Sequence, residues 1–259
     1  MSLWFYKYHG AGNDFILIDN RQDIFQPDTN RIARLCERKF GIGANGLMLL
    51  ETNQQSDFAM RYFNADGHES TMCGNGGRCM VAFAKKLGII DDKTHFVASD
   101  GTHQAVIMEN KLIALKMQDV SDIRISHDHL FIDTGSPHYI RFVNNLSKVP
   151  VYEEGKKIRN DTSISKGGTN VNFVSLEKDG MISIRTYERG VENETLACGT
   201  GAVASAIGSY LIAKSDKTSY TVNVMGGKLQ VSFEVENKNT FRNVWLTGPA
   251  EFVFEGSIP

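Results

Sequence analysis

The chain of 259 residues repeats a cysteine-glycine motif at a fixed distance along its length. Residues 62–76 (YFNADGHESTMCGNG) align without a gap with residues 187–201 (YERGVENETLACGTG), which places Cys73 over Cys198. Two further pairs align at nearly the same offset: residues 41–51 with 167–177, and residues 10–11 with 135–136. Self-similarity over a period of about half the chain predicts two homologous halves rather than a solenoid of short repeats.

Each half contains the signals of both strands and one central helix. Segments rich in β-branched and aromatic residues predict strands at 15–19, 94–98, 182–187 and 221–225. An apolar segment follows each repeated cysteine and predicts helices over 74–87 and 199–213, with Gly88 suited to end the first. The second segment is almost wholly small or apolar, as in a buried helix. We therefore predict the α+β class: two homologous pseudo-symmetric domains, each a mainly antiparallel sheet wrapped around a central helix.

The same repeat sets the expected domain boundaries. We predict an N-terminal domain over residues 1–118 that carries Cys73, and a C-terminal domain over residues 119–248 that carries Cys198. The final strand, at about residues 249–259, is expected to return to the N-terminal domain.

Composition narrows the classes of partner. Hydrophobic residues make up 41% and charged residues 22%, as in an ordinary soluble globular protein. The net charge of −2, with scattered Lys and Arg, predicts no nucleic-acid partner. Apolar stretches fall short of the roughly 20 residues of a membrane helix, and the N-terminus lacks a basic segment followed by an apolar one. We expect no membrane partner and a cytoplasmic location. The sequence leaves the oligomeric state open, with a homodimer as one alternative.

The four cysteines do not form a disulfide scaffold or a zinc-binding pattern. Cys36 lies in a segment with helical spacing of apolar residues, which predicts a buried structural thiol. Cys79 follows Cys73 by six positions on a predicted buried helix, so it should face the core. No metal site is expected, and no phosphate-binding or dinucleotide-binding motif calls for a cofactor.

Cys73 and Cys198 are different, because each precedes a predicted helix and is followed by glycines. A helix N-terminus has unpaired N–H groups and partial positive charge, which stabilise a thiolate or a carboxylate. Two such thiols suit inversion of a carbon centre, in which one thiolate removes a proton from one face and the other thiol returns a proton to the opposite face. The alternative is that both are core residues beside turn glycines.

The motifs resemble those of diaminopimelate epimerases almost end to end. Residues 63–67 (FNADG) with 72–79 (MCGNGGRC), and residues 187–190 (YERG) with 194–201 (ETLACGTG), match the two catalytic motifs. Residues 8–15 and 168–173 also match in order. The resemblance implies a pyridoxal-independent epimerase that interconverts LL- and meso-diaminopimelate on the route to lysine and peptidoglycan. It also implies two α+β domains that close over this small-molecule substrate.

Roles carried over from this resemblance make Cys73 and Cys198 the catalytic acid–base pair. The implied substrate contacts are Asn13, Asn64, Gly74, Asn75, Asn170, Glu188, Arg189, Gly199 and Thr200. Arg189 has the planar geometry to hold the distal carboxylate, and Glu188 can accept from an ammonium group. Glu188 and His138 are also expected to act as supporting residues.

The chain departs from the usual family pattern near two of these contacts. Ser136 stands where many members have Asn, so a substrate contact at Ser136 is an open expectation. Asn45 stands where Asp is common, and Gly46 stands where some members bind substrate through Gln, so Gly46 receives no role.

Two alternatives remain. A related cofactor-independent racemase could act on proline or another amino acid, although such a substrate lacks the distal carboxylate that Arg189 would hold. A non-catalytic thiol redox sensor would instead use the paired cysteines to form a reversible disulfide.

Overall fold

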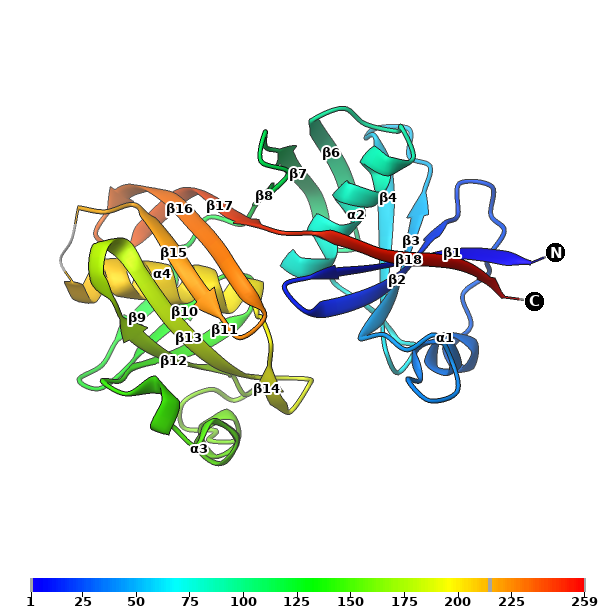
Figure 1. The fold of residues 1–259 in the computed structure, drawn as a ribbon. Coiled ribbons are helices and arrows are strands. Elements are labelled where there is room, and N and C mark those ends of the chain that lie inside the picture. Colours follow the sequence, from blue (N-terminus) through cyan, green and yellow to red (C-terminus); the bar gives the residue numbers. More distant parts are fainter. Residues whose placement is uncertain (1, 214–215, 259) are drawn as a thin grey trace. The chain divides into compact units, whose positions relative to one another are not determined.

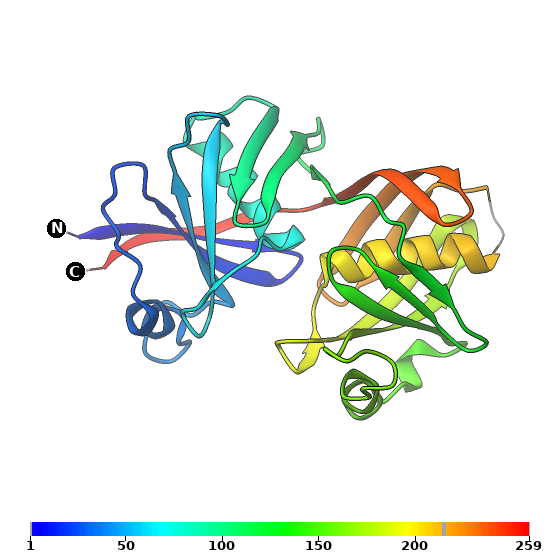
Figure 2. The same cartoon turned by 180° about the vertical axis from the view of Figure 1, so that it is seen from behind.

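The computed structural model describes residues 2–213 and 216–258, and the chain divides into two compact units (Figures 1 and 2). Unit 1 comprises residues 1–115 together with 248–259, and unit 2 comprises residues 116–247. Among the helices of the described residues, none has the length and apolar character needed to cross a membrane.

Unit 1 is a sheet that curves around helix α2 (Gly74–Lys86). Its strands are β1 (Leu3–Gly10), β2 (Asn13–Asp19), β3 (Gly46–Glu51), β4 (Phe58–Asn64), β5 (Glu69–Ser70), β6 (Lys93–Ala98), β7 (Gly101–Ile107), β8 (Ile113–Lys116) and β18 (Glu251–Ile258). Pairing runs β18-β1-β2-β3-β4-β6-β7-β8, with β5 added beside β4. The pairs β2–β3 and β4–β6 are parallel, and the others are antiparallel. Helix α1 (Thr29–Cys36) contacts β3.

Unit 2 repeats this order around helix α4 (Gly199–Ala213). Its strands are β9 (Ile123–Ile125), β10 (Leu130–Asp133), β11 (Pro137–Phe142), β12 (Asn170–Leu176), β13 (Met181–Glu188), β14 (Asn193–Thr195), β15 (Ser219–Val224), β16 (Gly227–Asn237) and β17 (Thr240–Gly248). Helix α3 (Val151–Arg159) and the short helices η1 (Leu146–Lys148) and η2 (Lys178–Gly180) lie in connections. Pairing runs β9-β10-β11-β12-β13-β15-β16-β17, again with two parallel pairs, β11–β12 and β13–β15. The predicted α+β class with two pseudo-symmetric halves is confirmed.

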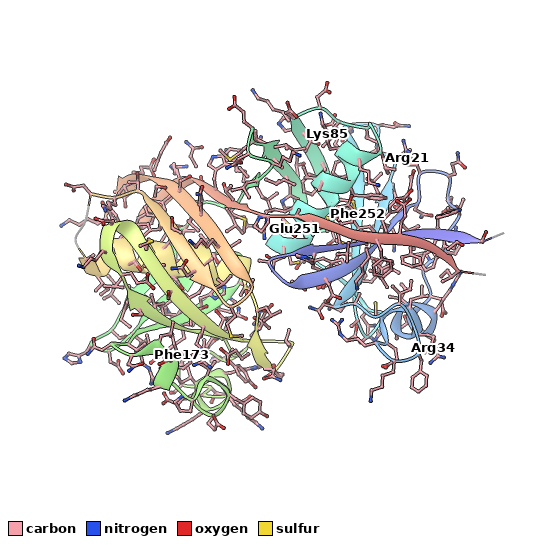
Figure 3. All side chains as sticks on the ribbon, viewed as in Figure 1. Arg21, Arg34, Lys85, Phe173, Glu251 and Phe252 are labelled. Carbon is pink, nitrogen blue, oxygen red and sulfur yellow. The ribbon has the colours of Figure 1, made fainter. Side chains whose placement is uncertain are left out.

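The strand from the C-terminus belongs to the sheet of unit 1. β18 pairs with β1 along most of its length and takes the place that β9 has beside β10 in unit 2. Phe252 on β18 packs edge-on against Tyr8 of β1, with ring centroids 5.5 Å apart, and the Lys86 amine lies 4.2 Å from the Phe252 ring centroid (Figure 3). The chain therefore crosses from unit 2 back to unit 1 to complete the first sheet.

The cores are apolar, and the central strands β2, β3 and β12 are buried along most of their length. In unit 2, Phe173 on β12 is fully buried and packs with Tyr139 and Tyr187 (Figure 3). In unit 1, Cys36 is buried in the cluster formed around β2 and β3, where burial raises the pKa of its thiol to about 11. The prediction of a structural thiol at Cys36 is confirmed.

The central helices begin where the sequence predicts. α2 ends at Lys86, one residue before the predicted end, and α4 has the predicted bounds. Gly88 has φ of +68°, donates to the Lys85 carbonyl, and is followed by Ile89, which donates to the Ala84 carbonyl. This is the hydrogen-bond pattern of a helix terminated by a left-handed glycine.

The ladders correct the gapless alignment of the two halves. Phe63 pairs with Glu69 in unit 1, and Tyr187 pairs with Glu194 in unit 2, so the next residues, Asn64 and Glu188, are equivalent ends of β4 and β13. Eight residues then separate Asn64 from Cys73, and nine separate Glu188 from Cys198. The connection before the cysteine is therefore one residue longer in unit 2, and the constant offset predicted for residues 62–76 and 187–201 is wrong at the strands.

Candidate active site

Cys73 is the N-cap residue of α2. Its backbone is extended, with φ of −106° and ψ of 149°, and its sulfur accepts the N–H of Gly76 at 3.2 Å. The sulfur thus occupies the place where a Ser or Asp oxygen usually caps a helix. A Cβ on Gly76 would lie 3.1 Å from this sulfur and 3.1 Å from the Met48 sulfur, so glycine leaves the space that the half-buried thiol occupies.

Cys198 holds the equivalent place before α4. Its carbonyl accepts the N–H of Ala202, and its sulfur lies 3.5 Å from the Thr200 hydroxyl. A Cβ on Gly201 would lie 3.3 Å from the Cys198 sulfur and 2.5 Å from the side-chain oxygen of Asn172. Both sulfurs therefore lie at the partially positive end of a helix, beside a glycine that gives them room.

A fully buried arginine lies one turn into α2. The Arg78 guanidinium donates to the Gly74 carbonyl at 3.0 Å, to the Asn75 side-chain oxygen at 2.8 Å and to the Pro249 carbonyl at 3.4 Å. Arg78 thereby links Gly74 and Asn75, which are predicted substrate contacts, to Pro249, which lies just before β18. Sequence reasoning gave Arg78 no role, although a lone arginine within an apolar helix segment was a visible signal.

Asn13 begins β2 and is held by a chain of polar side chains. Arg38 donates to the Asn45 side-chain oxygen, and Asn45 donates to the side-chain oxygen of Asn13, each at 2.8 Å. Since a guanidinium can only donate, this chain fixes the orientation of both amides. Asn64 lies half-buried at the end of β4 in the same unit.

Asn170 and Ser136 are joined in unit 2. The Asn170 amide nitrogen donates to the Ser136 hydroxyl oxygen at 2.8 Å, and its amide oxygen accepts the backbone N–H of Arg189 at 2.9 Å. The amide of the buried Asn170 therefore positions its neighbours. Ser136, used as an acceptor here, keeps its own hydroxyl proton for another acceptor.

Glu188 ends β13, Arg189 follows it directly, and the two side chains differ in exposure. Glu188 is half-buried; desolvation raises the pKa of its carboxyl, and the hydrogen bond from Thr195 at 2.8 Å opposes this rise. The Arg189 side chain is exposed, and its guanidinium lies 3.4 Å from the Gly167 carbonyl. An acceptor for ammonium and a donor for carboxylate therefore follow one another at the end of one strand.

His138 lies in a buried polar network beneath α4. Thr186 donates to the side-chain oxygen of Asn172, so the Asn172 amide nitrogen must donate to Nδ1 of His138, at 3.0 Å. The proton of a neutral ring is then on Nε2, which is buried and has no hydrogen-bond partner in the described residues. Burial, with a smaller contribution from the charge of Arg189, lowers the pKa of His138 to about 3.

The predicted residues thus fall into two groups. Unit 1 holds Asn13, Asn64, Cys73, Gly74 and Asn75, and unit 2 holds Ser136, His138, Asn170, Glu188, Arg189, Cys198, Gly199 and Thr200. Thr200 is further held in unit 2 by its carbonyl, which accepts from the Thr134 hydroxyl at 3.1 Å. Across residues 2–213 and 216–258, His, Cys, Asp and Glu side chains form no group of three that could hold a metal ion.

Solved structures of other proteins share this fold. A phenazine biosynthesis protein of the PhzF family from Bacillus anthracis has a TM-score of 0.76 at 16% identity, with 100% of this chain and 99% of that chain covered. A hydroxyproline epimerase from Agrobacterium vitis has a TM-score of 0.72 at 13% identity, with 99% and 92% covered. At these identities the likeness concerns the fold alone.

Sequence comparison identifies the family. The sequence model of diaminopimelate epimerase matches residues 5–121 and 130–253. The diaminopimelate epimerase of Flavobacterium psychrophilum is 55% identical over 254 residues, covering 98% of this chain and 99% of the relative. That of Chlorobaculum tepidum is 45% identical over 260 residues, covering 96% and 98%. The chain belongs to the diaminopimelate epimerase family.

Proposed function

We propose that this protein interconverts LL- and meso-diaminopimelate, with Cys73 and Cys198 acting on opposite faces of one α-carbon. The observation that carries the proposal is that each thiol lies at the N-terminus of a glycine-rich helix, in equivalent places of two repeated units, in a chain of this family. A reaction that exchanges the roles of acid and base on reversal suits such a duplicated arrangement.

The chemistry needs one proton removed and one proton supplied. The thiolate of one cysteine takes the α-proton and becomes a thiol, and the electron pair of the broken C–H bond passes into the substrate carboxylate. The thiol of the other cysteine then gives its proton to the opposite face and becomes a thiolate. Return to the starting state requires only proton exchange with solvent, so the cycle balances.

Helix N-termini would stabilise the charge that develops on the reacting carboxylate. We assign the backbone N–H groups of Gly74 and Asn75 in α2, and of Gly199 and Thr200 in α4, as its donors. N–H groups fixed at a helix N-terminus need little reorganisation when negative charge develops, which is the physical basis of an oxyanion hole.

The remaining polar groups of diaminopimelate call for selective contacts. We assign the distal carboxylate to Arg189, whose planar guanidinium can donate two parallel hydrogen bonds. Glu188 and the amides of Asn13 and Asn64 are assigned to the ammonium groups and carboxylates, and the Ser136 hydroxyl to a donated hydrogen bond. Asn170 contributes by holding Ser136 and the Arg189 backbone.

His138 acts in this proposal as a neutral supporting residue. Because burial lowers its pKa to about 3, the imidazole carries no charge near neutral pH, and its Nε2–H is a fixed donor.

Incubation of the purified protein with LL-diaminopimelate, without pyridoxal phosphate, tests the function. The expected product is the meso isomer, with no racemisation of L-proline or hydroxyproline under the same conditions. Cys73→Ala and Cys198→Ala should each abolish the reaction while the fold persists. Cys36→Ala, which changes a buried thiol on α1, is the matched control and should retain activity. Turnover of a proline-type substrate in place of diaminopimelate would move the protein to a different activity within the same fold.

A further inference from the structure

Arg78 is a buried cation that the described residues do not neutralise with a carboxylate. Its side chain has no exposed surface, and each acceptor in its hydrogen bonds is a neutral oxygen, from Gly74, Asn75 or Pro249. Burying an ionised side chain without a counterion is costly, and hydrogen bonds to carbonyl oxygens recover only part of that cost. The arrangement therefore calls for an anion nearby.

Charged groups on the elements packed around α2 are already engaged or neutral. The titratable or cationic side chains there are Tyr6, Lys7, Tyr8 and His9 on β1, Asp14 and Asp19 on β2, Glu51 on β3, Asp100 in the β6–β7 turn, His103 on β7, and Glu251 and Glu255 on β18. On β18, Glu251 lies 3.7 Å from His9, and Glu255 lies 3.5 Å from Lys86 of α2. Asp14 pairs with Lys7 and Arg38, Asp19 with Arg21, and Asp100 with His103. Glu51 lies 3.8 Å from Arg61. Burial raises the pKa of Tyr8, which keeps its phenol neutral.

Two thiols remain as candidates for the counterion. Desolvation by burial lowers the pKa of Arg78, and negative charge on Cys79 or Cys73 would oppose this and favour the ionised guanidinium. Cys79 is fully buried, and burial raises the pKa of its thiol far above neutral pH. Cys73 caps the helix and already accepts an N–H, both of which favour a thiolate, and it is less buried than Cys79.

Unit 2 lacks this cation. The position of α4 that corresponds to Arg78, five residues after the capping cysteine, is Val203, which is fully buried. The two helix N-termini therefore share a cysteine and two glycines, Gly74 and Gly76 in α2 and Gly199 and Gly201 in α4, but only α2 has a cation at the fifth position after the cysteine. The difference between Arg78 and Val203 would make the two pseudo-symmetric thiols unequal.

We propose that Arg78 holds Cys73 as the thiolate in the resting protein, so that Cys73 is the base and Cys198 the acid before substrate binds. This rests on the proposed function for the roles, but the charge asymmetry itself is a property of the free protein. Arg78 is a positioning residue: it acts through Cys73 and through the Asn75 amide that it orients. The attraction is mutual, because a thiolate that stabilises the guanidinium is stabilised by it to the same extent.

Alkylation of the free protein tests the asymmetry without substrate. Iodoacetamide is applied over a pH series, and the fraction modified at Cys73 and at Cys198 is read by peptide mapping. The midpoint of each pH profile, rather than the absolute rate, reports the thiolate population, so slower access of reagent to the more buried Cys198 does not enter the comparison. The substitutions of Arg78 below separate the effect of its charge from the effect of unequal burial. In the wild-type protein the midpoint of Cys73 should lie at least one pH unit below that of Cys198. Equal midpoints, or a lower one for Cys198, would overturn the proposal.

Two substitutions assign the effect to the charge of Arg78. In Arg78→Met the midpoint of Cys73 should rise by one pH unit or more while that of Cys198 stays in place. In Arg78→Lys, which keeps the charge, most of the low midpoint should return. An unchanged pH profile of Cys73 in a folded Arg78→Met variant would show that Arg78 has only a structural role, in its hydrogen bonds to Gly74, Asn75 and Pro249. If the wild-type protein shows the proposed midpoints but does not epimerise diaminopimelate, the proposed function is wrong and this inference stands.

Discussion

The buried histidine of unit 2 predicts a specific dependence of stability on pH. His138 has a pKa of about 3 in the folded protein, mainly because it is buried, and about 6.5 when unfolded. Below pH 6.5 the unfolded chain therefore binds a proton at His138 that the folded chain does not bind. The stability associated with this group is complete above pH 6.5, falls as the pH drops towards 3, and changes no further below that.

The size of the effect follows from proton linkage. One proton taken up only by the unfolded state lowers the free energy of unfolding by about 1.4 kcal/mol for each pH unit in this window. His138→Asn removes the titration and retains both an acceptor for Asn172 and an amide donor. The difference in the free energy of unfolding between the wild-type protein and His138→Asn should therefore decrease by about 1.4 kcal/mol for each unit that the pH falls.

Urea denaturation at several pH values between 7 and 4.5, followed by circular dichroism, provides the free energies for both proteins. Carboxyl groups that titrate in the same range cancel in the difference, because both proteins contain them. If the two pH profiles run parallel, His138 is protonated in the folded state and the neutral network described here is incorrect.

The proposed site leads to further predictions. Arg189→Lys keeps the charge but loses the planar pair of donors, so kcat/KM for diaminopimelate should fall tenfold or more with little change in Tm. Unaltered kinetics would show that Arg189 is a solvated surface residue without a substrate contact. Hydrogen peroxide should inactivate the protein through a Cys73–Cys198 disulfide, with two electrons passing to the oxidant, and a thiol reductant should restore activity. Peptide mapping should find Cys36 and Cys79 reduced, whereas a Cys73–Cys79 bridge would contradict the proposed arrangement.

Local signals in the sequence were sufficient to predict the central helices and the duplication of the fold. The cysteine, the glycines and the apolar run predicted both helix starts, because caps and burial depend on residues close in the chain. Gly88 marked the end of α2 for the same reason. The fold class followed from finding these signals twice.

Long-range features were not readable from the same signals. A gapless alignment could not show that the connection before Cys198 has an extra residue, since strand register depends on pairing partners far away in the sequence. The burial of Arg78 depends on a carbonyl of Pro249, which is brought beside α2 by the returning strand. Similarly, motif matching assigned Asn170 to the substrate but gave no sign of its hydrogen bonds to Ser136 and to the backbone of Arg189, which are 34 and 19 residues away in the chain.

The central claim is that two different thiols handle the two protons, and the isotope content of the first product tests it most directly. Protiated LL-diaminopimelate is incubated with the protein in D2O, and substrate and meso product are analysed at low conversion by mass spectrometry. The two-thiol account predicts deuterium at the α-carbon of the product, delivered by a solvent-exchanged thiol, and protium at the α-carbon of the remaining substrate. Product that retains the original α-proton would mean that one base carries the proton between faces, which contradicts the account.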